Sequence, residues 1–342
     1  MGQRVTLKDV AARAGVTSAT VSYVLNGKKS ISEDTKRRVV EAIQELGYVP
    51  DLSARTLSMS QRSSKLIGVV VPQTEENRLM FHNNFYSEIL GSIEFHARQN
   101  GYHVIISATD ANESYLTLAK ERNLDGIIVI GMYPDEFYRQ MKESHIPIVL
   151  VDSYCNDHYY HNVRIDDAYG SYLATKHVLS KGHRNIAFFS GQLKENGVMK
   201  KRLLGYKDAL KEHGIEFNSK YVFEGQIDHE SGIESANQLL ESKLPATAVI
   251  AAADILAIGA MKGFYEKGVR VPDDISVMGF DDLKISKYLT PGLTTVRQEI
   301  SLKGEKAVDF LINNINVPDL TKQEQILPVS IIERGSVKQL GE

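Results

Sequence analysis

From residue 66 onward, short apolar runs rich in Val and Ile alternate with amphipathic stretches long enough for helices. Strands buried on both faces have such continuous apolar runs, and parallel strands need crossover helices between them. The alternation predicts an α/β body of two doubly wound parallel sheets, which bind ligands at the carboxyl ends of their strands. The predicted strands are 66–71, 103–108, 126–130 and 147–151, then 185–190, 221–224, 247–252 and 275–280. Helices are predicted to begin near Tyr86, Glu113 and Pro134, and to span 167–180, 200–213, 231–241 and 254–267.

Residues 1–49 predict a small all-helical domain in front of this body. Thr6 can cap a first helix in which Asp9 completes a capping box, and Gly15 can end that helix with a positive φ. A second helix begins at Thr17 after a short turn, and this is the spacing of a helix-turn-helix. The exposed face of the second helix carries short side chains that can approach base edges in the major groove: Thr17, Ser18, Ala19, Ser22 and Tyr23.

The distribution of charge favours an anionic partner for the helical domain. Residues 1–65 hold 11 Lys and Arg against 6 Asp and Glu, whereas residues 66–342 hold 29 against 37. The net charge of −3 for the whole chain hides this difference. Any small helical hairpin can show similar capping residues, so it is the basic excess that favours DNA binding over a purely structural role.

Two long stretches of the N-terminal helical domain, called the head below, indicate a protein family. The chain carries TLKDVAARAGVTSATVSYVLNG at 6–27 and ISEDTKRRVVEAIQELGYVPDLSARTL at 31–57. Together with VRVPDDISVMGFDD at 269–282 and LTTVRQ at 293–298, they make essentially the whole chain resemble the LacI/GalR family of bacterial transcription regulators. The resemblance implies a periplasmic-binding-protein-like core of two doubly wound parallel-sheet subdomains. It also implies a small all-α helix-turn-helix domain and a hinge helix in front of that core.

The resemblance implies domain boundaries as well. The DNA-binding domain would span 1–49, and the hinge helix with its linker 50–65. The effector-binding and dimerisation core would span 66–342, with an N-subdomain of about 66–164 and 298–325 and a C-subdomain of about 165–297 and 326–334. Pro50 fits the first turn of a hinge helix, which is too short to be stable alone.

In the family, the hinge helix folds on the operator and inserts a leucine into the minor groove, and Leu57 is the matching residue. Tyr23 stands where the family most often has Arg, so the operator sequence cannot be carried over. The expected DNA-binding residues are Thr6, Thr17, Ser18, Ala19, Thr20, Ser22, Tyr23, Asn26, Arg55 and Leu57. Further phosphate contacts are expected from Lys28, Lys29, Arg37 and Arg38.

For the core, the resemblance implies six effector-binding residues in the cleft between the subdomains: Phe85, Tyr86, Asp152, Arg202, Asp281 and Gln298. A guanidinium and carboxylates can bind vicinal hydroxyls through paired hydrogen bonds. A helix cap at Asp281 and a surface ion pair of Arg202 are the alternative structural roles. Ala253 replaces the Asn of many sugar-responsive members, and Ile227 replaces an aromatic residue. The effector is therefore open between a sugar or sugar derivative and, as the alternative, a purine or other corepressor.

Other functions have less support. The chain lacks G-x-G, G-x-x-x-x-G-K-[ST], G-x-S-x-G and H-E-x-x-H motifs, so we expect no enzymatic activity and no cofactor. A solute-binding protein could use the same core but has no need of a DNA-reading head. Possible metal ligands gather in one segment: Cys155, Asp157, His158 and His161. Their spacing matches no metal motif, and we expect no metal.

The cellular setting is also an expectation from the sequence. A single Cys cannot form an intramolecular disulfide, and the chain shows neither a leader pattern nor an apolar run of the roughly 20 residues that span a bilayer. We expect a cytoplasmic homodimer that binds double-stranded operator DNA and a small-molecule effector, with no membrane contact. We expect a dimer and not a tetramer, because few residues follow the last predicted strand near Ile331.

Overall fold

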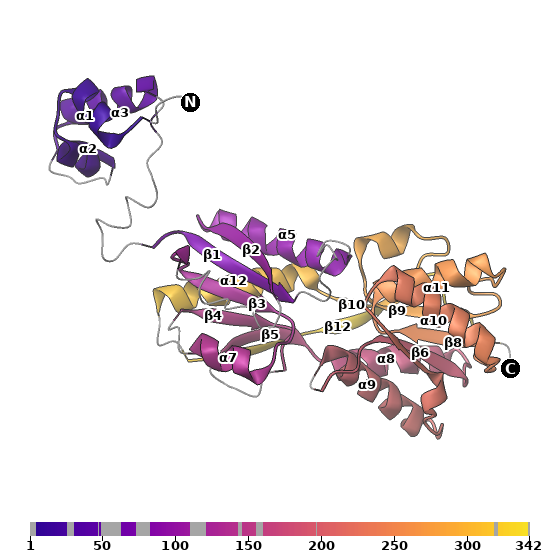
Figure 1. Ribbon diagram of the computed structural model, residues 1–342. Coiled ribbons are helices and arrows are strands. Elements are labelled where there is room, and N and C mark those ends of the chain that lie inside the picture. Colours follow the sequence, from indigo (N-terminus) through magenta and orange to yellow (C-terminus); the bar gives the residue numbers. More distant parts are fainter. Residues whose placement is uncertain are drawn as a thin grey trace. The chain divides into compact units, whose positions relative to one another are not determined.

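The computed structural model divides the chain into two compact units, 1–64 and 65–342 (Figure 1). It describes residues 5–25, 31–46, 48, 63–72, 83–109, 121–142, 146–154, 160–195, 197–317 and 321–340. None of the helices in these ranges is long and apolar enough to cross a membrane.

The first unit is the predicted all-helical head, and its described residues form three helices. Its helices are α1 (Leu7–Ala14), α2 (Ser18–Leu25) and α3 (Glu33–Leu46). The predicted capping box is confirmed, because the Thr6 N–H donates to Asp9 Oδ2 at 2.7 Å and the Asp9 N–H donates back to Thr6 Oγ1 at 3.4 Å. Gly15 ends α1 with a φ of 66°. Val10, Val21 and other buried apolar side chains of the three helices form one small core.

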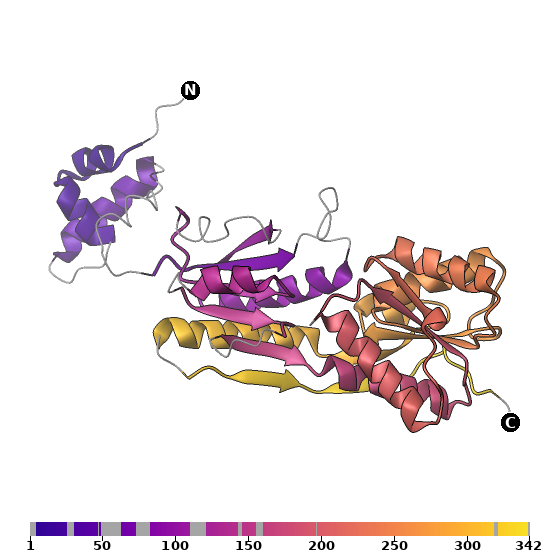
Figure 2. The ribbon, with the colours of Figure 1, turned by 60° about the horizontal axis from the view of Figure 1, so that its bottom comes forward.

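The first sheet of the core consists of six parallel strands in the order β11 (Glu324–Leu327), β5 (His161–Ile165), β4 (Ile148–Val151), β3 (Gly126–Ile130), β1 (Leu66–Pro72) and β2 (His103–Thr109). Its described helices are α5 (Asn84–Gln99), α7 (Asp135–Lys142) and α12 (Ile300–Asn316). Ile128 and its neighbours on one face pack against α5 and α12, and Ile127 on the other face packs against α7. Figure 2 shows α12 lying along strands that come some 150 residues earlier in the chain.

The second sheet has the order β12 (Val329–Ile332), β10 (Thr294–Gln298), β9 (Ser276–Asp281), β8 (Ala248–Ala251), β6 (Ile186–Gly191) and β7 (Val222–Gly225). Only β12 and β10 pair antiparallel among these strands. Helices α8 (Asp167–Ser180) and α9 (Val198–Glu212) cover one face, and α10 (His229–Ser242) and α11 (Asp254–Glu266) cover the other. A short 3-10 helix, η2 (Ser219–Tyr221), lies between α9 and β7, and another, η3 (Lys284–Tyr288), lies between β9 and β10.

The chain passes between the two sheets three times. It leaves the first sheet after β5 and enters α8, returns after β10 into α12, and crosses again between β11 and β12. Gln298 ends β10 and therefore lies at the junction of the two halves. The carboxyl ends of the parallel strands converge at this junction, which is where doubly wound sheets bind ligands.

The fold class predicted from the alternation is confirmed, and the eight predicted strands match observed ones within two residues. Three strands and one helix were not predicted from the sequence pattern: β5, β10, β11 and α12. His161, interpreted as part of a polar segment, lies fully buried in β5. Cys155, Asp157 and His158 lie outside the described residues, as does the helix predicted near Glu113.

Candidate functional site

Helix α2 presents the predicted base-reading residues of the head. Tyr23 is 42% exposed, and Thr17 and Ala19 are exposed as well, whereas Val21 is buried in the helical core. Thr17 Oγ1 accepts the backbone N–H of Thr20 at 3.2 Å and so caps the start of α2. The remaining predicted contacts on this helix are half-buried: Ser18, Thr20 and Ser22. The predicted residues Asn26, Lys28, Lys29, Arg55 and Leu57 lie outside the described residues.

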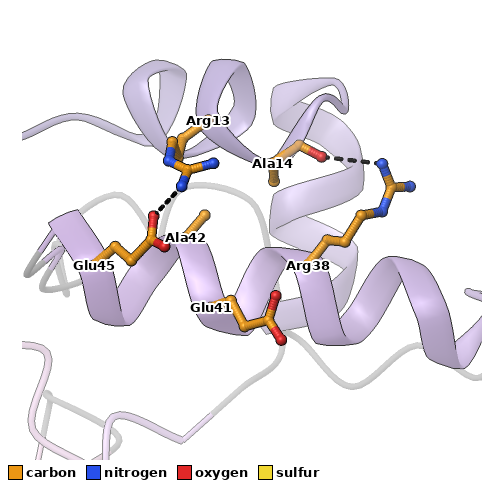
Figure 3. Close-up of a pocket in the computed structure, with 6 residues that line it drawn as sticks. All are labelled: Arg13, Ala14, Arg38, Glu41, Ala42 and Glu45. Carbon is orange, nitrogen blue, oxygen red and sulfur yellow. Dashed lines mark hydrogen bonds and ion pairs between the residues drawn. The ribbon is translucent and has the colours of Figure 1, made fainter.

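Two arginines of the head brace α1 against α3 (Figure 3). Arg13 pairs with Glu45 at 2.5 Å, and Arg38 Nη1 donates to the carbonyl of Ala14 at 3.3 Å, where a cation complements the negative end of α1. The hollow between them has a volume of about 110 Å³, which is small for an organic ligand. Its lining residues are Arg13, Ala14, Arg38, Glu41, Ala42 and Glu45. These contacts fix the position of α1 and give Arg38 a structural role beside its expected one.

Within the chain, Asp34 competes with phosphate for Arg37 and Arg38, which are expected to contact DNA. Arg37 Nη2 lies 2.7 Å from Asp34 Oδ1, and Arg38 Nε lies 3.5 Å from Asp34 Oδ2. These pairs are exposed, so solvent screening makes them weak, and phosphates can compete for the guanidinium groups.

In the core, the structure brings the six predicted effector residues to the carboxyl ends of the strands. Asp152 follows β4, Asp281 ends β9, and both have a positive φ, 54° and 127°, which side-chain-bearing residues rarely adopt. Phe85 and Tyr86 lie in the first turn of α5, half-buried against the core. The remaining two are Arg202 on α9 and Gln298 at the end of β10.

Four of these six side chains are joined through Lys303 by a continuous series of hydrogen bonds that we call the interdomain chain, defined by Asp152, Lys303, Gln298, Asp281 and Arg202. Lys303 Nζ donates to Asp152 Oδ1 at 2.6 Å and to Gln298 Oε1 at 2.5 Å. Gln298 Nε2 donates to Asp281 Oδ1 at 2.6 Å, and Arg202 Nη1 lies 3.4 Å from the same oxygen. Asp152 and Lys303 belong to the half containing the first sheet, and Asp281 and Arg202 to the other half. The interdomain chain therefore ties the two halves together through buried polar groups.

The environment of Arg202 rules out the surface ion pair considered as its alternative role, because the residue is only 5% exposed. Its Nε donates to Asp167 Oδ1 at 2.8 Å and its Nη1 to the carbonyl of Ala252 at 2.5 Å. The guanidinium also lies 3.6 Å from the ring centroid of Phe280. Asp281 is not a helix cap either, because its carboxylate accepts a hydrogen bond from the side chain of Gln298.

Lys303 and Asp167 were missed by the sequence analysis. Lys303 is fully buried in the first turn of α12, and Asp167 is 1% exposed at the start of α8. Tyr154 OH donates to Asp167 Oδ2 at 2.8 Å. The signal that could have found Lys303 is its position five residues after Gln298, in a stretch whose spacing marks it as the inner face of a helix.

A further buried carboxylate, Asp254, holds the loop after β9 in place. It accepts the N–H of Leu283 at 2.8 Å and the hydroxyls of Ser286 and Thr295 at 2.6 and 2.5 Å. Gly279 allows this close approach, because a Cβ there would lie 2.2 Å from Asp254 Oδ1. The bonds position the segment that carries Asp281.

Burial dominates the titration of these carboxyls. It raises the pKa of Asp281 to about 7, which the nearby Arg202 guanidinium only partly offsets. Burial likewise raises the pKa of Asp152 above its usual range, against the lowering effect of the Lys303 ammonium. Negative charge at this junction is thus unfavourable without cations beside it.

Comparison with known proteins agrees with this architecture. Residues 6–51 match the family model "Bacterial regulatory proteins, lacI family", and residues 175–337 match "Periplasmic binding protein-like domain". The chain is 33% identical over 341 residues to the HTH-type transcriptional repressor PurR of Vibrio atlanticus, covering 98% of this chain and 99% of that one. It is 32% identical over the same length to the ribose operon repressor of Haemophilus influenzae, again covering 98% and 99%.

Solved structures show the same likeness. The lac repressor dimer bound to operator and the anti-inducer ONPF has a TM-score of 0.83 and 29% identity, covering 98% of this chain and 100% of that chain. The CelR–cellobiose complex has a TM-score of 0.74 and 28% identity, covering 97% and 100%. The head and the two-sheet core together define a DNA-binding regulator with a periplasmic-binding-protein-like core. The chain belongs to the lacI family of bacterial regulatory proteins.

Proposed function

We propose that this protein is a transcription repressor whose affinity for operator DNA is switched by a small ligand bound at the interdomain chain. The single observation that carries the proposal is the union, in one polypeptide, of a helix-turn-helix head with a core whose strand ends bring six predicted ligand-binding side chains together. Two relatives that are 33% and 32% identical to nearly the whole chain are repressors. The protein acts in the cytoplasm, where its operator is.

On the DNA side, α2 enters the major groove and its exposed face reads bases. The residues proposed to touch DNA are Thr6, Thr17, Ser18, Ala19, Thr20, Ser22, Tyr23, Asn26, Arg55 and Leu57. Tyr23 gives the recognition helix an aromatic ring where a guanidinium would read guanine, so the operator differs from those of Arg-bearing members. Two heads of a homodimer require two related half-sites at a fixed spacing. The lac repressor dimer bound to its operator supports this arrangement by similarity.

On the ligand side, Phe85, Tyr86, Asp152, Arg202, Asp281 and Gln298 are proposed to bind the effector, between an N-subdomain of about 66–164 and 298–325 and a C-subdomain of about 165–297 and 326–334. Sugars are the first candidate class, because the structural relatives include complexes with cellobiose and with ribose. A purine is the second candidate, because a PurR repressor is 33% identical over nearly the whole chain.

The proposal is tested by selecting operators from random DNA with the full-length protein and footprinting the winning sequence. We expect a near-palindromic site bound as a dimer, with affinity that falls steeply as salt rises because phosphate contacts release counterions. The matched variants are Tyr23→Phe, which keeps the ring, and Tyr23→Ala, which removes it. Selection of no preferred sequence at physiological salt would refute the regulator assignment.

A further inference from the structure

The buried side chains at the junction include more carboxyl groups than cations. Three carboxyls, Asp152, Asp167 and Asp281, face two cations, Lys303 and Arg202, and all five residues are at most 9% exposed. Both cations already have carboxylate partners: Lys303 has Asp152, and Arg202 has Asp167 and Asp281. The site therefore has one carboxyl group more than its cations balance.

Lys303 has two of its three donors engaged within the protein. An ammonium has three N–H groups. Two of them serve Asp152 and Gln298, and the ring centroid of Phe85 lies 5.6 Å from Nζ. Arg202 is engaged through Nε and Nη1, so among the described residues its Nη2 is the guanidinium nitrogen that makes no hydrogen bond.

These contacts discriminate between chemical classes of ligand. A ligand hydroxyl can donate to the free lone pairs of a carboxylate and accept from Arg202 Nη2 without breaking any ion pair. A phosphate or carboxylate of the ligand would bring a second unbalanced negative charge into a buried site, or would have to displace Asp152 from Lys303. Either change weakens binding, because a buried charge without a partner is unfavourable in a desolvated environment.

Building on the proposed function, we propose that the effector is an uncharged, hydroxyl-bearing molecule, and that the Asp152–Lys303 pair is the element that excludes phosphorylated and carboxylated analogues. Lys303 is in this sense a specificity-determining residue, because Asp152 already balances its charge and two of its three N–H groups are already bonded. The raised pKa values of Asp152 and Asp281 agree with this, because further negative charge is already disfavoured there.

The first arm of the test uses inorganic phosphate, with chloride at equal ionic strength as the reference, and measures the Tm of the full-length protein. Phosphate stabilises most proteins slightly by exclusion from their surface, so the comparison is between variants. Wild type and Lys303→Met should show the same small shift. Asp152→Asn and Asp281→Asn each remove a carboxylate, and in each the phosphate-induced rise in Tm should exceed that of wild type by about 2 °C or more.

Lys306→Met is the matched control for Lys303→Met, since Lys306 lies on the same helix but pairs with the part-exposed Glu305 and Asp309.

The second arm measures calorimetric binding of matched pairs: ribose with ribose 5-phosphate, and glucose with glucose 6-phosphate and gluconate. Where a pair binds, wild type should have about 100-fold or more higher affinity for the uncharged member than for the anionic one. In Asp152→Asn this ratio of affinities should be smaller by a factor of at least about 10. Tighter binding of an anionic member overturns the proposal. A phosphate shift in wild type that Lys303→Met abolishes also overturns it, as does an unchanged shift in both Asn variants. Operator binding measured in the same preparations shows separately whether the proposed regulator function holds.

Discussion

At the scale of single residues, Arg202 is the cation on which the buried charges of the second half depend. Its guanidinium is bonded to Asp167, lies within ion-pair distance of Asp281 and stacks on Phe280. Arg202→Met keeps much of the side-chain length but leaves two buried carboxylates without their partner. We expect the free energy of unfolding to fall by about 3–5 kcal/mol in urea titrations.

The matched control for this change lies on the same helix. Lys200 pairs with Glu195 near the surface, with side-chain exposures of 38% and 80%. Lys200→Met should change the free energy of unfolding by less than about 1 kcal/mol, because exposed pairs contribute little. Equal losses in the two variants would show that burial is not what makes Arg202 important.

Asp281 gives the stability of the core an unusual dependence on pH. Because burial raises its pKa from 3.8 to about 7, the folded chain keeps between these values a proton that the unfolded chain releases. The free energy of unfolding should therefore fall as pH rises through this window and level off above about 7. Relative to wild type, Asp281→Asn should become progressively more stable from about pH 5 to pH 8 in urea titrations.

Asp274→Asn serves as the control for this pH series. Hydrogen bonds from Arg270 lower the pKa of Asp274 to about 2, so its contribution is lost only below its unfolded pKa of 3.8. The stability of this variant relative to wild type should stay constant over the same range. A constant difference for Asp281→Asn as well would contradict the assigned titration.

The site residues that the sequence did not reveal share one physical property. Lys303, Asp167 and Tyr154 are types that are mostly exposed or only partly buried in proteins, and sequence patterns interpret them as surface. Their burial here depends on partners far away in the chain: Lys303 binds Asp152, 151 residues earlier. Asp281 and Gln298 could be predicted because they lie in the strings at 269–282 and 293–298 that resemble a family.

At the scale of elements, the crossing of α8 and α9 depends on a single glycine. A Cβ on Gly205 would lie 1.8 Å from the carbonyl oxygen of Ala168, and the clashing atoms belong to the backbone, which cannot rotate away. Although Ala favours helix formation over Gly, we expect Gly205→Ala to lower the free energy of unfolding by about 2–3 kcal/mol. Thermal and urea unfolding followed by far-UV circular dichroism measure this.

Lys211→Ala, at an exposed position of α9, is the control for the Gly205 variant. It should change stability by no more than about 0.5 kcal/mol, because it alters neither packing nor the helix crossing. A Gly205→Ala protein as stable as wild type would mean that the two helices can separate without loss.

The elements that could be predicted are those whose sequences follow the burial pattern of a two-sided sheet. Strands such as β3 are apolar throughout because helices cover both faces. Strand β5 escaped prediction because its polar residues are buried with partners: Asn162 donates to the carbonyl of Ser153 at 2.7 Å. Strand β11 was not predicted because it lies at the edge of its sheet, where Glu324 and Ile326 are exposed.

At the scale of the whole core, the halves are joined by more than the three chain crossings. The backbone N–H of Lys284 in one half donates to Glu88 Oε1 in the other at 3.0 Å, and Gln298 links Lys303 to Asp281 through the junction. Such bonds hold only for a narrow range of angles between the halves. A ligand that inserts into the interdomain chain must rearrange it, and so has different affinities for different angles, which is the condition for switching.

A coupling between effector binding and operator binding follows from that condition. If the effector changes operator affinity by some factor, operator must change effector affinity by the same factor, and we expect a coupling free energy of about 1–3 kcal/mol. Gln298→Leu removes a side chain that joins Lys303 to Asp281, so it should weaken effector binding and, separately, reduce the ratio of effector affinities with and without operator that measures the coupling. Gln140→Leu, on the exposed face of α7, is the matched control and should leave the coupling unchanged. Fluorescence anisotropy with labelled operator and calorimetry with the effector measure all four affinities of the thermodynamic cycle for each protein. An unchanged coupling free energy in Gln298→Leu would show that other residues of the core transmit the coupling.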